Sequence, residues 1–318
     1  MPPTAPAAPD VFPICLGGNV FGWTADEAQS FAVLDAYAAA GGNFIDTADM
    51  YSAWVAGHDG GESEAIIGRW MEARGCRDRM VIATKVGQLR GLEGLSAATI
   101  RTAAEGSLRR LRTDRIDLYY AHRDDPGTPL PESLGAFDAL VREGKVRRIA
   151  ASNYTGARLA EALAVSDGGG LARFSAIQPH YNLVHRGEYE GELAGVCARE
   201  GMACHPYFAL AKGFLTGKYR PGVAVDSPRS RGASQYLDAR GMGILAAVEA
   251  VAALRGVAPA AVAIAWLRAQ PTVVAPIASA RTTAQLAEIL PGAALRLEAG
   301  DLAALDAVSR PHGAQGAH

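Results

Sequence analysis

The sequence has few cysteines, and none of them are spaced as in a metal site or a disulfide scaffold. Cys15, Cys76, Cys197 and Cys204 are the four cysteines among 318 residues, and no two have Cys-x-x-Cys spacing. A small secreted domain held by disulfides has a much higher cysteine density. We therefore expect a reducing compartment, with the cytoplasm as the default location.

The sequence also lacks a strong charge of either sign. The formal net charge is −2, and the longest basic cluster is "RRLR" at 109–112. Proteins that bind nucleic acid usually carry an extended basic face. We expect no nucleic-acid partner, and a small molecule is the favoured ligand.

Long apolar runs are missing as well. The most apolar region, 243–267, is interrupted by Glu249, Arg255 and Pro259, so it does not predict a membrane span. The first ten residues, "MPPTAPAAPD", have neither a basic nor an apolar segment of the kind that a signal peptide needs. We expect no membrane association, a flexible arm at 1–10 and a flexible tail at 311–318.

What the sequence does contain is an alternation of short apolar runs with longer segments of helical period. With 49% apolar residues, the chain can bury a large core. The predicted strands are 14–18, 43–46, 80–85, 116–121, 146–152, 174–179, 202–207 and 272–276. Predicted helices include 27–40, 63–74, 97–111, 130–143 and 284–290, and Asp26 and Ser96 stand where N-caps are expected.

This alternation leaves a closed (β/α)8 TIM barrel or an open doubly wound sheet. Polar side chains follow strand after strand, which favours the barrel because its loops surround one mouth. These strand-end residues are Asp46, Lys85, His122, Ser152, Asn153, Gln178 and Tyr207. We predict a single (β/α)8 barrel domain over 1–318, with residues 218–240 as a mobile loop over the mouth.

Four of the strand-end and loop residues have a joint chemical use. Asp46, Tyr51, Lys85 and His122 should face one cavity if the barrel forms. An ammonium close to a phenol favours the phenolate and lowers the phenol pKa, while a carboxylate holds the ammonium in place. A neutral imidazole beside them can hydrogen-bond a carbonyl oxygen. The set predicts an oxyanion site with a built-in acid, although each residue alone has an ordinary structural explanation.

Two further patterns carry no function. "GMGILA" at 241–246 matches a dinucleotide-binding pattern but follows no predicted strand, so we expect Gly241 and Gly243 in a loop that enters a helix. The seven histidines form neither H-E-x-x-H nor a zinc-like Cys/His pair, and we predict no metal.

Several segments, in order, resemble the aldo-keto reductase superfamily over nearly the whole chain. They include "FIDTADMY", "VIATKVG", "DLYYAHRDD", "IAASNY", "IQPHYNL", "GFLTGKY" and "PIASARTTAQLAEIL". Within the superfamily the chain is most similar to the bacterial and potassium-channel β-subunit-like branch. The resemblance implies a (β/α)8 barrel that binds NADPH and reduces carbonyls.

The resemblance also implies residue roles. Tyr51 would be the general acid, Lys85 and Asp46 the pair that tunes it, and His122 the donor that orients the carbonyl. Ser152, Asn153 and Gln178 resemble the groups that bind the nicotinamide amide, and Tyr207 resembles the ring that stacks on nicotinamide. Leu210, Gly213 and Lys218 would complete this part of the cofactor site, near the pyrophosphate.

The adenosine end of the expected cofactor site lies in "SARTTAQLAE". Ser279 and Arg281 stand at the start of a predicted helix, where free N–H groups and a guanidinium suit a phosphate. The resemblance implies that Arg281 binds the 2′-phosphate of NADPH, with Gln285 and Glu288 toward the adenine. This arrangement favours NADP over NAD.

Large aromatic and apolar side chains on loops are candidates for a substrate pocket. Trp23, Met50, Trp54 and Tyr181 follow predicted strands one, two and six. Packing of one loop on another explains them equally well, and both possibilities stay open at this point.

The leading hypothesis is an NADPH-dependent oxidoreductase that reduces an aldehyde or ketone to the alcohol. A Schiff-base aldolase using Lys85 is an alternative, because barrels with a strand-end lysine can perform that chemistry. A weakly active NADPH-binding module that senses redox state is the second alternative. The oligomeric state and the identity of the carbonyl substrate do not follow from the sequence.

Overall fold

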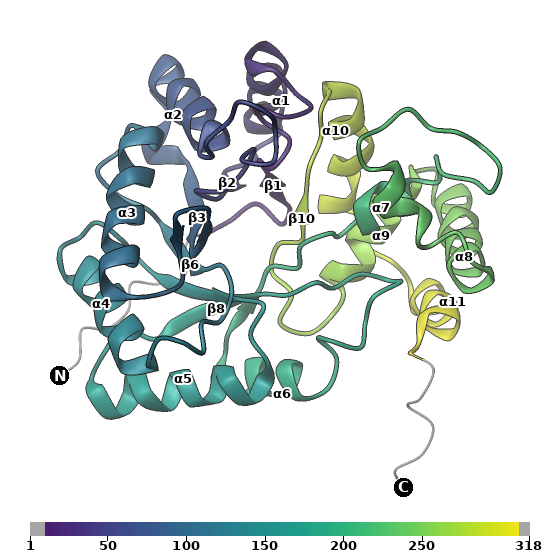
Figure 1. Cartoon of the computed structure of the whole chain (residues 1–318). Coiled ribbons are helices and arrows are strands. Elements are labelled where there is room, and N and C mark those ends of the chain that lie inside the picture. Colours follow the sequence, from purple (N-terminus) through teal and green to yellow (C-terminus); the bar gives the residue numbers. More distant parts are fainter. Residues whose placement is uncertain (1–9, 312–318) are drawn as a thin grey trace, which may run out of the picture.

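A computed structural model of the chain describes residues 10–311 and contains a curled sheet of eight parallel strands surrounded by helices (Figure 1). The strands are β1 (Cys15–Gly17), β2 (Phe44–Asp46), β3 (Val81–Val86), β6 (Leu118–Ala121), β7 (Ile149–Ser152), β8 (Phe174–Gln178), β9 (Ala203–Cys204) and β10 (Ile277–Ala278). Their order is β10-β1-β2-β3-β6-β7-β8-β9. The predicted flexible arm and tail lie outside the described residues, apart from Asp10 and Pro311.

Backbone hydrogen bonds close the sheet between the β9 region, residues 204–206, and the β10 region, residues 272–277. The Cys204 N–H donates to the Thr272 carbonyl at 2.8 Å, and the Ile277 N–H donates to the Pro206 carbonyl at 2.8 Å. A closed parallel sheet with a helix after each strand is the architecture of a (β/α)8 barrel. The predicted fold class is therefore confirmed.

The last strand lies later in the chain than the sequence suggests. Residues 272–276 were the expected strand, but β10 consists of Ile277 and Ala278, which pair with Cys15 and Leu16 of β1. Val273 only forms an isolated bridge to Cys204. The β-branched run at 272–274 has the stronger strand propensity, yet pairing with a neighbour decides where a strand forms.

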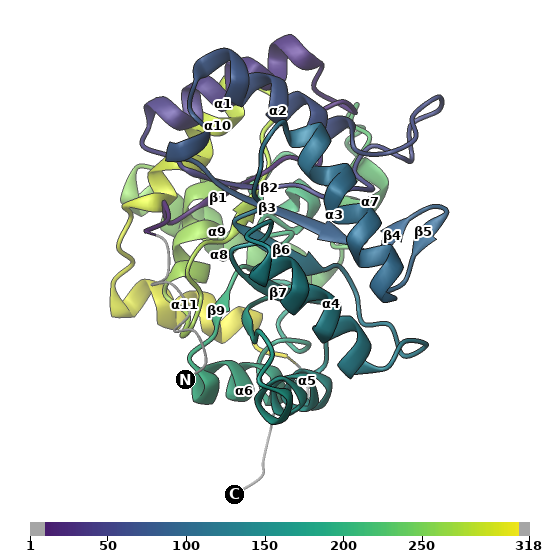
Figure 2. The same ribbon diagram turned by 90° about the vertical axis from the view of Figure 1, so that its left-hand side faces the viewer.

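The helices surround the barrel, as the perpendicular view shows (Figure 2). They are α1 (Glu27–Ala39), α2 (Glu62–Arg74), α3 (Ala97–Leu111), α4 (Leu130–Arg142), α5 (Gly156–Gly169), α6 (Glu192–Glu200), α7 (Ser230–Ser234), α8 (Ala239–Arg255), α9 (Pro259–Arg268), α10 (Thr283–Ile289) and α11 (Ala299–Ser309). The predicted caps are present: the Asp26 side chain accepts from the Gln29 N–H, and the Ser96 hydroxyl accepts from the Thr99 N–H.

Two local features differ from the expectation. A short hairpin, β4 (Gln88–Leu89) and β5 (Leu92–Glu93), follows β3 and was not predicted. Gly241 and Gly243 lie inside α8, not in a loop, because the Asp238 side chain caps the helix by accepting the Gly241 N–H at 2.6 Å. Within residues 10–311, no single helix is long and apolar enough to cross a membrane. Helices α8 and α9 are long and apolar enough only when they are taken together, and they are bent by 98° relative to each other.

The core has an outer and an inner part. The outer part lies between helices and strands, and the inner part fills the barrel with Phe44 and Tyr120 among smaller residues such as Ala83, Ala150 and Ala176. Successive strand residues point to opposite faces, so Tyr120 points into the barrel while Tyr119 packs against a helix residue, Phe137. A filled barrel leaves the loops at the carboxyl ends of the strands to form a site.

Candidate active site

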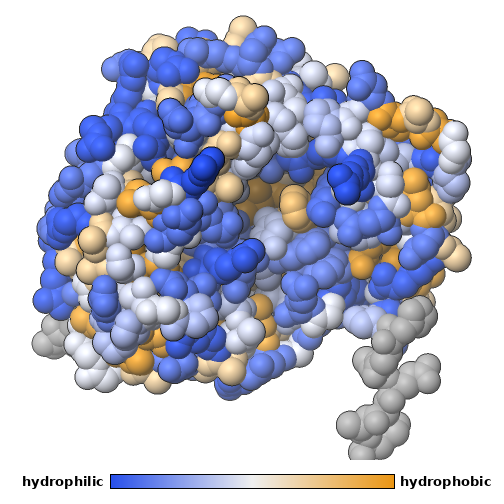
Figure 3. Space-filling view, viewed as in Figure 1, coloured by the Kyte–Doolittle hydropathy of each residue, from blue (hydrophilic) through white to orange (hydrophobic). Residues whose placement is uncertain are grey.

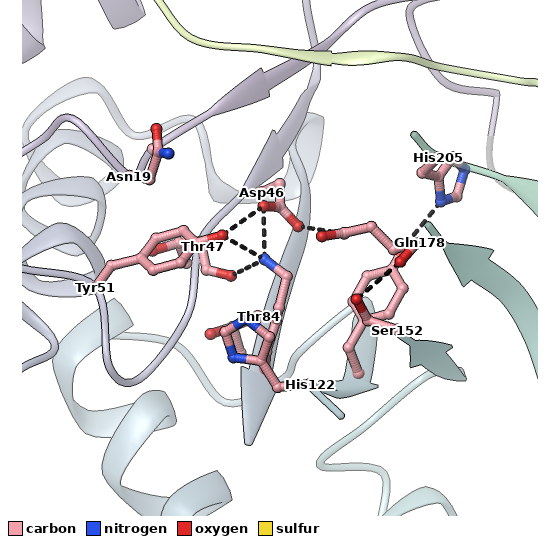
Figure 4. Close-up of polar contacts among 12 residues, drawn as sticks. Asn19, Asp46, Thr47, Tyr51, Thr84, His122, Ser152, Gln178 and His205 are labelled. Atoms are coloured by element: carbon pink, nitrogen blue, oxygen red, sulfur yellow. Dashed lines mark hydrogen bonds and ion pairs between the residues drawn. The ribbon is translucent and has the colours of Figure 1, made fainter. Parts of the chain in front are cut away.

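The four ionisable residues of the predicted set, Asp46, Tyr51, Lys85 and His122, meet in one cluster, and Figure 4 labels Asp46, Tyr51 and His122 in it. The Lys85 Nζ donates to Asp46 Oδ2 at 2.6 Å, to the Thr47 carbonyl at 2.8 Å and to the Tyr51 hydroxyl at 2.9 Å. The Lys85 side chain has no exposed surface. An ammonium has three N–H donors, so all three are used inside the protein.

The strand register explains how this cluster forms. Asp46 of β2 pairs with Ala83 of β3, so Lys85 lies two residues further along β3 and on the same face of the sheet. Tyr51 lies on the loop that leaves β2, and its N–H donates to the Ala48 carbonyl in a tight turn. The next residue, Ser52, has a φ of 75°, a left-handed conformation that turns the chain back.

Burial controls the protonation of the phenol and the amine. Burial raises the pKa of Tyr51 to about 12, although Lys85 acts in the opposite direction. Burial alone would lower the pKa of Lys85, but Asp46 and Tyr51 outweigh it and raise that pKa. At neutral pH the site therefore holds a protonated phenol bonded to an ammonium. The expected lowering by Lys85 is present but is smaller than the effect of burial.

His122 completes the cluster as a neutral imidazole. Its ring centroid lies 6.2 Å from that of Tyr51. Burial is the main cause that holds the pKa of His122 well below its usual range, and Lys85 and Arg123 add to it. Its Nδ1 is buried and has no hydrogen-bond partner among residues 10–311. A neutral imidazole can donate one hydrogen bond to a ligand oxygen.

A second group of polar residues connects this cluster to the next strands. The Gln178 Nε2 donates to Asp46 Oδ1 at 2.9 Å, so both carboxylate oxygens of Asp46 are engaged. The Ser152 hydroxyl donates to the Gln178 carbonyl at 2.8 Å, and the Tyr207 hydroxyl donates to Asn153 Oδ1 at 2.9 Å. These bonds fix the orientation of the side chains at the mouth of the barrel.

One large cavity contains most of the predicted site. Its volume is about 740 Å³, and it opens as a hollow near the middle of the face in Figure 3. The predicted residues that line it are Asp46, Tyr51, Trp54, His122, Ser152, Asn153, Gln178, Tyr207, Leu210, Gly213, Lys218, Ser279, Arg281, Gln285 and Glu288. Lys85 lies directly behind Asp46 and Tyr51. A cavity of this size is large enough for a cofactor-sized molecule.

The residues proposed for a substrate pocket are only partly brought to the cavity. Trp54 lines the cavity and has 46% of its surface exposed. Trp23 packs edge-on against Trp54, with 5.4 Å between the ring centroids. Neither Trp23 nor Met50 is among the lining residues. Tyr181 is 1% exposed and packs against Trp266, because its ring faces the core while its hydroxyl bonds Glu190. The structure therefore does not bring Tyr181 to the cavity.

Several cations line the cavity without a carboxylate partner. Lys212, Lys218, Arg229 and Arg281 make no ion pair with any residue in the described part of the chain. The backbone N–H of Arg281 donates to Gln285 Oε1 at 2.9 Å at the start of α10, so the Arg281 guanidinium is not used in this bond. An excess of unpaired positive charge fits a phosphate-bearing ligand.

Sequence reasoning missed part of this wall. Asn19, which follows β1, accepts a hydrogen bond from the Ser279 hydroxyl at 2.7 Å. Lys212 has a left-handed φ of 59° in the 3-10 segment Ala211–Thr216, which the sequence does not indicate. The position of Asn19 directly after a strand was the one available signal.

One group of residues has metal-ligand composition. His180, His185 and Glu188 place their ligand atoms within 4.8 Å of one another. The two imidazole rings, however, stack with 3.7 Å between their centroids and 11° between their planes, so their in-plane lone pairs lie in separate, nearly parallel planes and do not converge on one point. The His180 ring also stacks on the Tyr207 ring, with 5.4 Å between the two centroids.

Comparison with known proteins decides the family. The model of the aldo/keto reductase family matches residues 13–310. The chain belongs to the aldo/keto reductase family. It is 35% identical over 294 residues to norsolorinic acid reductase stcV of Emericella nidulans, an alignment that covers 87% of this chain and 72% of that protein.

Two bacterial proteins are similar over more of their length. Protein tas of Escherichia coli is 32% identical over 327 residues, with 94% of each chain covered. The uncharacterized oxidoreductase YrpG of Bacillus subtilis is 33% identical, with 90% of this chain and 88% of that protein covered. Family membership and these relatives assign this aldo/keto reductase to the oxidoreductases that act on carbonyl groups.

Proposed function

We propose that the protein reduces an aldehyde or ketone to the alcohol, with NADPH as the reductant and Tyr51 as the general acid. The observation that carries the proposal is the bond between Lys85 Nζ and the Tyr51 hydroxyl, 2.9 Å long, at the wall of the large cavity. The substrate is a small carbonyl compound, and the expected location is the cytoplasm.

The side chains around the cavity have complementary tasks in this proposal. Tyr51 keeps its proton at neutral pH and can give it to a carbonyl oxygen. Lys85, held by Asp46, stabilises the phenolate that remains after the proton leaves. The neutral His122 donates a hydrogen bond that orients the same oxygen and stabilises the charge developing on it.

The donors along the cavity fit NADPH. When bound, NADPH supplies the hydride that the carbonyl carbon receives. Asn153 and Tyr207, already hydrogen-bonded to each other, present an amide and an aromatic face for the nicotinamide. Arg281 and the start of α10 offer a guanidinium and free N–H groups for the 2′-phosphate, with Gln285 and Glu288 beside them.

The contacts of Lys85 disfavour the aldolase alternative. A Schiff base forms on a neutral amine that can reach its substrate. Lys85 has no exposed surface, uses all three N–H donors inside the protein and has a raised pKa. An NADPH-binding redox sensor would share the cofactor site but would show negligible turnover with every carbonyl.

The test is NADPH consumption, followed by absorbance, with a panel of aldehydes and ketones. Tyr51→Phe removes the acid and should lower kcat by about 10²–10⁴-fold, while NADPH affinity changes little. Tyr236→Phe, which removes a hydroxyl that does not line the cavity, is the matched control. If Tyr51→Phe keeps most of the activity, Tyr51 is not the acid.

A further inference from the structure

Tyr207 is the ring that the proposed reaction places against nicotinamide, and two hydrogen bonds fix the direction of its long axis. Its backbone N–H donates to the Pro179 carbonyl at 3.0 Å, and its hydroxyl donates to Asn153 Oδ1 at 2.9 Å. A phenol ring that is held at both ends can still turn about the line between them, because this rotation moves neither end. The two bonds therefore leave the plane of the Tyr207 ring undetermined.

The ring of His180 packs where it can set that plane. It stacks on Tyr207 with 5.4 Å between the ring centroids and only 20° between the ring planes. Phe208 meets the Tyr207 ring edge-on, at 69° and 5.0 Å. Tyr207 and Phe208 line the large cavity and His180 does not, so His180 supports the Tyr207 ring from outside the cavity.

A second imidazole holds His180 in turn. The His185 ring stacks on it with 3.7 Å between the centroids and 11° between the planes. The His185 N–H donates to the carbonyl and to Oδ1 of Asn182, both at 3.0 Å, and the Asn182 Nδ2 donates to the Phe208 carbonyl at 2.9 Å. The turn that carries His185 is thus hydrogen-bonded to the backbone next to Tyr207, and the three rings form one stack.

The contacts of His180 are those of a flat, uncharged ring. Burial is the main cause that lowers the pKa of His180 to about 3, and His185 and Lys212 add to it, so the ring is neutral at pH 7. Its Nε2 is buried without a hydrogen-bond partner among residues 10–311, which adds nothing to stability. Its contribution therefore comes from its two stacked faces, and a benzene ring could make the same contacts.

We propose that His180 is a positioning residue, which fixes the plane of the Tyr207 ring and thereby the plane in which nicotinamide binds. Aromatic rings stack favourably when their planes are parallel and offset, so a Tyr207 ring that is free to turn holds nicotinamide less firmly. Hydride transfer requires aligned reacting atoms, so poorer alignment lowers kcat. This inference rests on the proposed carbonyl reduction with NADPH and names a residue outside the cavity on which that reaction depends.

The first measurement concerns binding and needs no carbonyl substrate. Isothermal titration calorimetry gives the Kd of NADPH and of 2′-phospho-ADP-ribose, which has the same adenosine and phosphate groups but no nicotinamide. His180→Ala should weaken NADPH binding about three- to tenfold, the range of one aromatic contact, and leave the Kd of 2′-phospho-ADP-ribose within about twofold. His180→Phe should keep the wild-type ratio of the two Kd values, because it keeps both stacked faces. His185→Ala, which removes only the outer ring, should shift the ratio in the same direction by a smaller factor.

The second measurement shows whether His180 acts through Tyr207. The kcat and the KM for one aldehyde are measured at saturating NADPH for His180→Ala, for Tyr207→Ala and for the double variant. His180→Ala should lower kcat about tenfold and leave the KM within about twofold, but it should lower kcat by less than about twofold when residue 207 is already alanine. His58→Ala removes a half-buried histidine that does not line the cavity, and this matched control should change none of these values. Thermal melting establishes that each variant is folded.

Three results would overturn the proposal while the wild type still reduces carbonyls with NADPH, so that the proposed function survives. The first is an equal weakening of NADPH and 2′-phospho-ADP-ribose in His180→Ala, which would mean general damage to the cavity. The second is an unchanged ratio of the two Kd values in His180→Ala. The third is the same loss of kcat from His180→Ala with and without the Tyr207 ring. A wild type that consumes NADPH with no member of a broad carbonyl panel would instead overturn the proposed function, and this inference with it.

Discussion

At the residue scale, Asp49 is a carboxyl group that the proposed chemistry does not use. It is fully buried, and neither oxygen makes a hydrogen bond of good geometry in the described part of the chain. Burial, with Glu64 as the second cause, raises the pKa of Asp49 from 3.8 to about 7, while Arg110 and Lys85 oppose the shift. A carboxyl with a raised pKa makes stability depend on pH.

Asp49→Asn should remove this dependence. Below pH 3.8 the carboxyl is protonated in both the folded and the unfolded chain, so it costs nothing. As the pH rises to about 7, the unfolded chain ionises first, and the folded wild type progressively loses stability relative to Asp49→Asn. The difference should reach about 2–4 kcal/mol above that pH. Urea unfolding at a series of pH values measures it.

An exposed carboxyl on the same loop is the control. Asp59→Asn should leave the wild-type pH dependence intact, because Asp59 is exposed to water. Unfolding curves for wild type and Asp49→Asn that shift in parallel from pH 4 to pH 8 would contradict the proposed burial of a titrating carboxyl.

For single residues, the sequence could predict which side chains lie together but not how deeply they are buried. The order of Asp46, Tyr51, Lys85 and His122 along the strands predicted that they lie together, and the structure brings them together. The net pKa of Tyr51 could not be predicted, because it depends on how much water the surrounding loops exclude. The topology determines which side chains lie near one another, whereas the depth of their burial depends on how all the loops at the mouth of the barrel pack.

At the scale of the elements, the long helices and the central strands were predicted within a few residues. Helix α3 has the predicted bounds, because Ser96 caps its start and Leu111 ends its apolar face. The hairpin β4–β5 was missed because "QLRGLE" contains no β-branched residue. Its turn depends on Gly91, which has a φ of 80°.

The contact between α2 and α3 depends on one glycine. A Cβ at Gly68 of α2 would lie 2.3 Å from the Arg110 carbonyl oxygen and 2.9 Å from the Leu111 Cα, both backbone atoms of the facing segment. Gly68→Ala should therefore destabilise the protein by about 2–4 kcal/mol, since the two helices must separate. Chemical denaturation measures the change.

Gly135 provides the matched control. It lies inside α4, and a Cβ there would meet nothing within 4 Å. Gly135→Ala should stabilise the protein by about 0.5–1 kcal/mol, because alanine loses less backbone freedom than glycine in a helix. A Gly68→Ala variant as stable as Gly135→Ala would mean that α2 and α3 are not held this closely.

At the scale of the whole molecule, the barrel could be predicted but the full cavity wall could not. The alternation of strands and helices predicted a closed sheet, and the hydrogen bonds between Cys204 and Thr272 and between Ile277 and Pro206 close it. Arg229 lies on the wall because residues 227–229 of the long connection at 218–240 reach the cavity. The conformation of such a long connection depends on contacts across the molecule, which no local pattern records.

Because the barrel is closed, a ligand in the cavity contacts both the first and the last strand region of the chain. The cavity extends from Asn19, which follows the first strand, to Arg281, which follows the last, and the Ser279–Asn19 hydrogen bond joins the two. A ligand that fills it contacts parts of the chain that are far apart in sequence. At about 100 times its Kd, such a ligand should stabilise the folded state by about 2.7 kcal/mol.

NADPH should therefore raise the Tm of the wild type more than the same concentration of NADH, which lacks the 2′-phosphate that we assign to Arg281. In Arg281→Ala, the Tm rise with NADPH should fall to that with NADH, while the NADH effect stays the same, because only the 2′-phosphate contact is lost. Differential scanning calorimetry of both proteins with each cofactor measures these four shifts. Equal shifts with NADPH and NADH in the wild type, or an equal loss of both in Arg281→Ala, would remove Arg281 from the 2′-phosphate site and leave the cofactor preference to other residues.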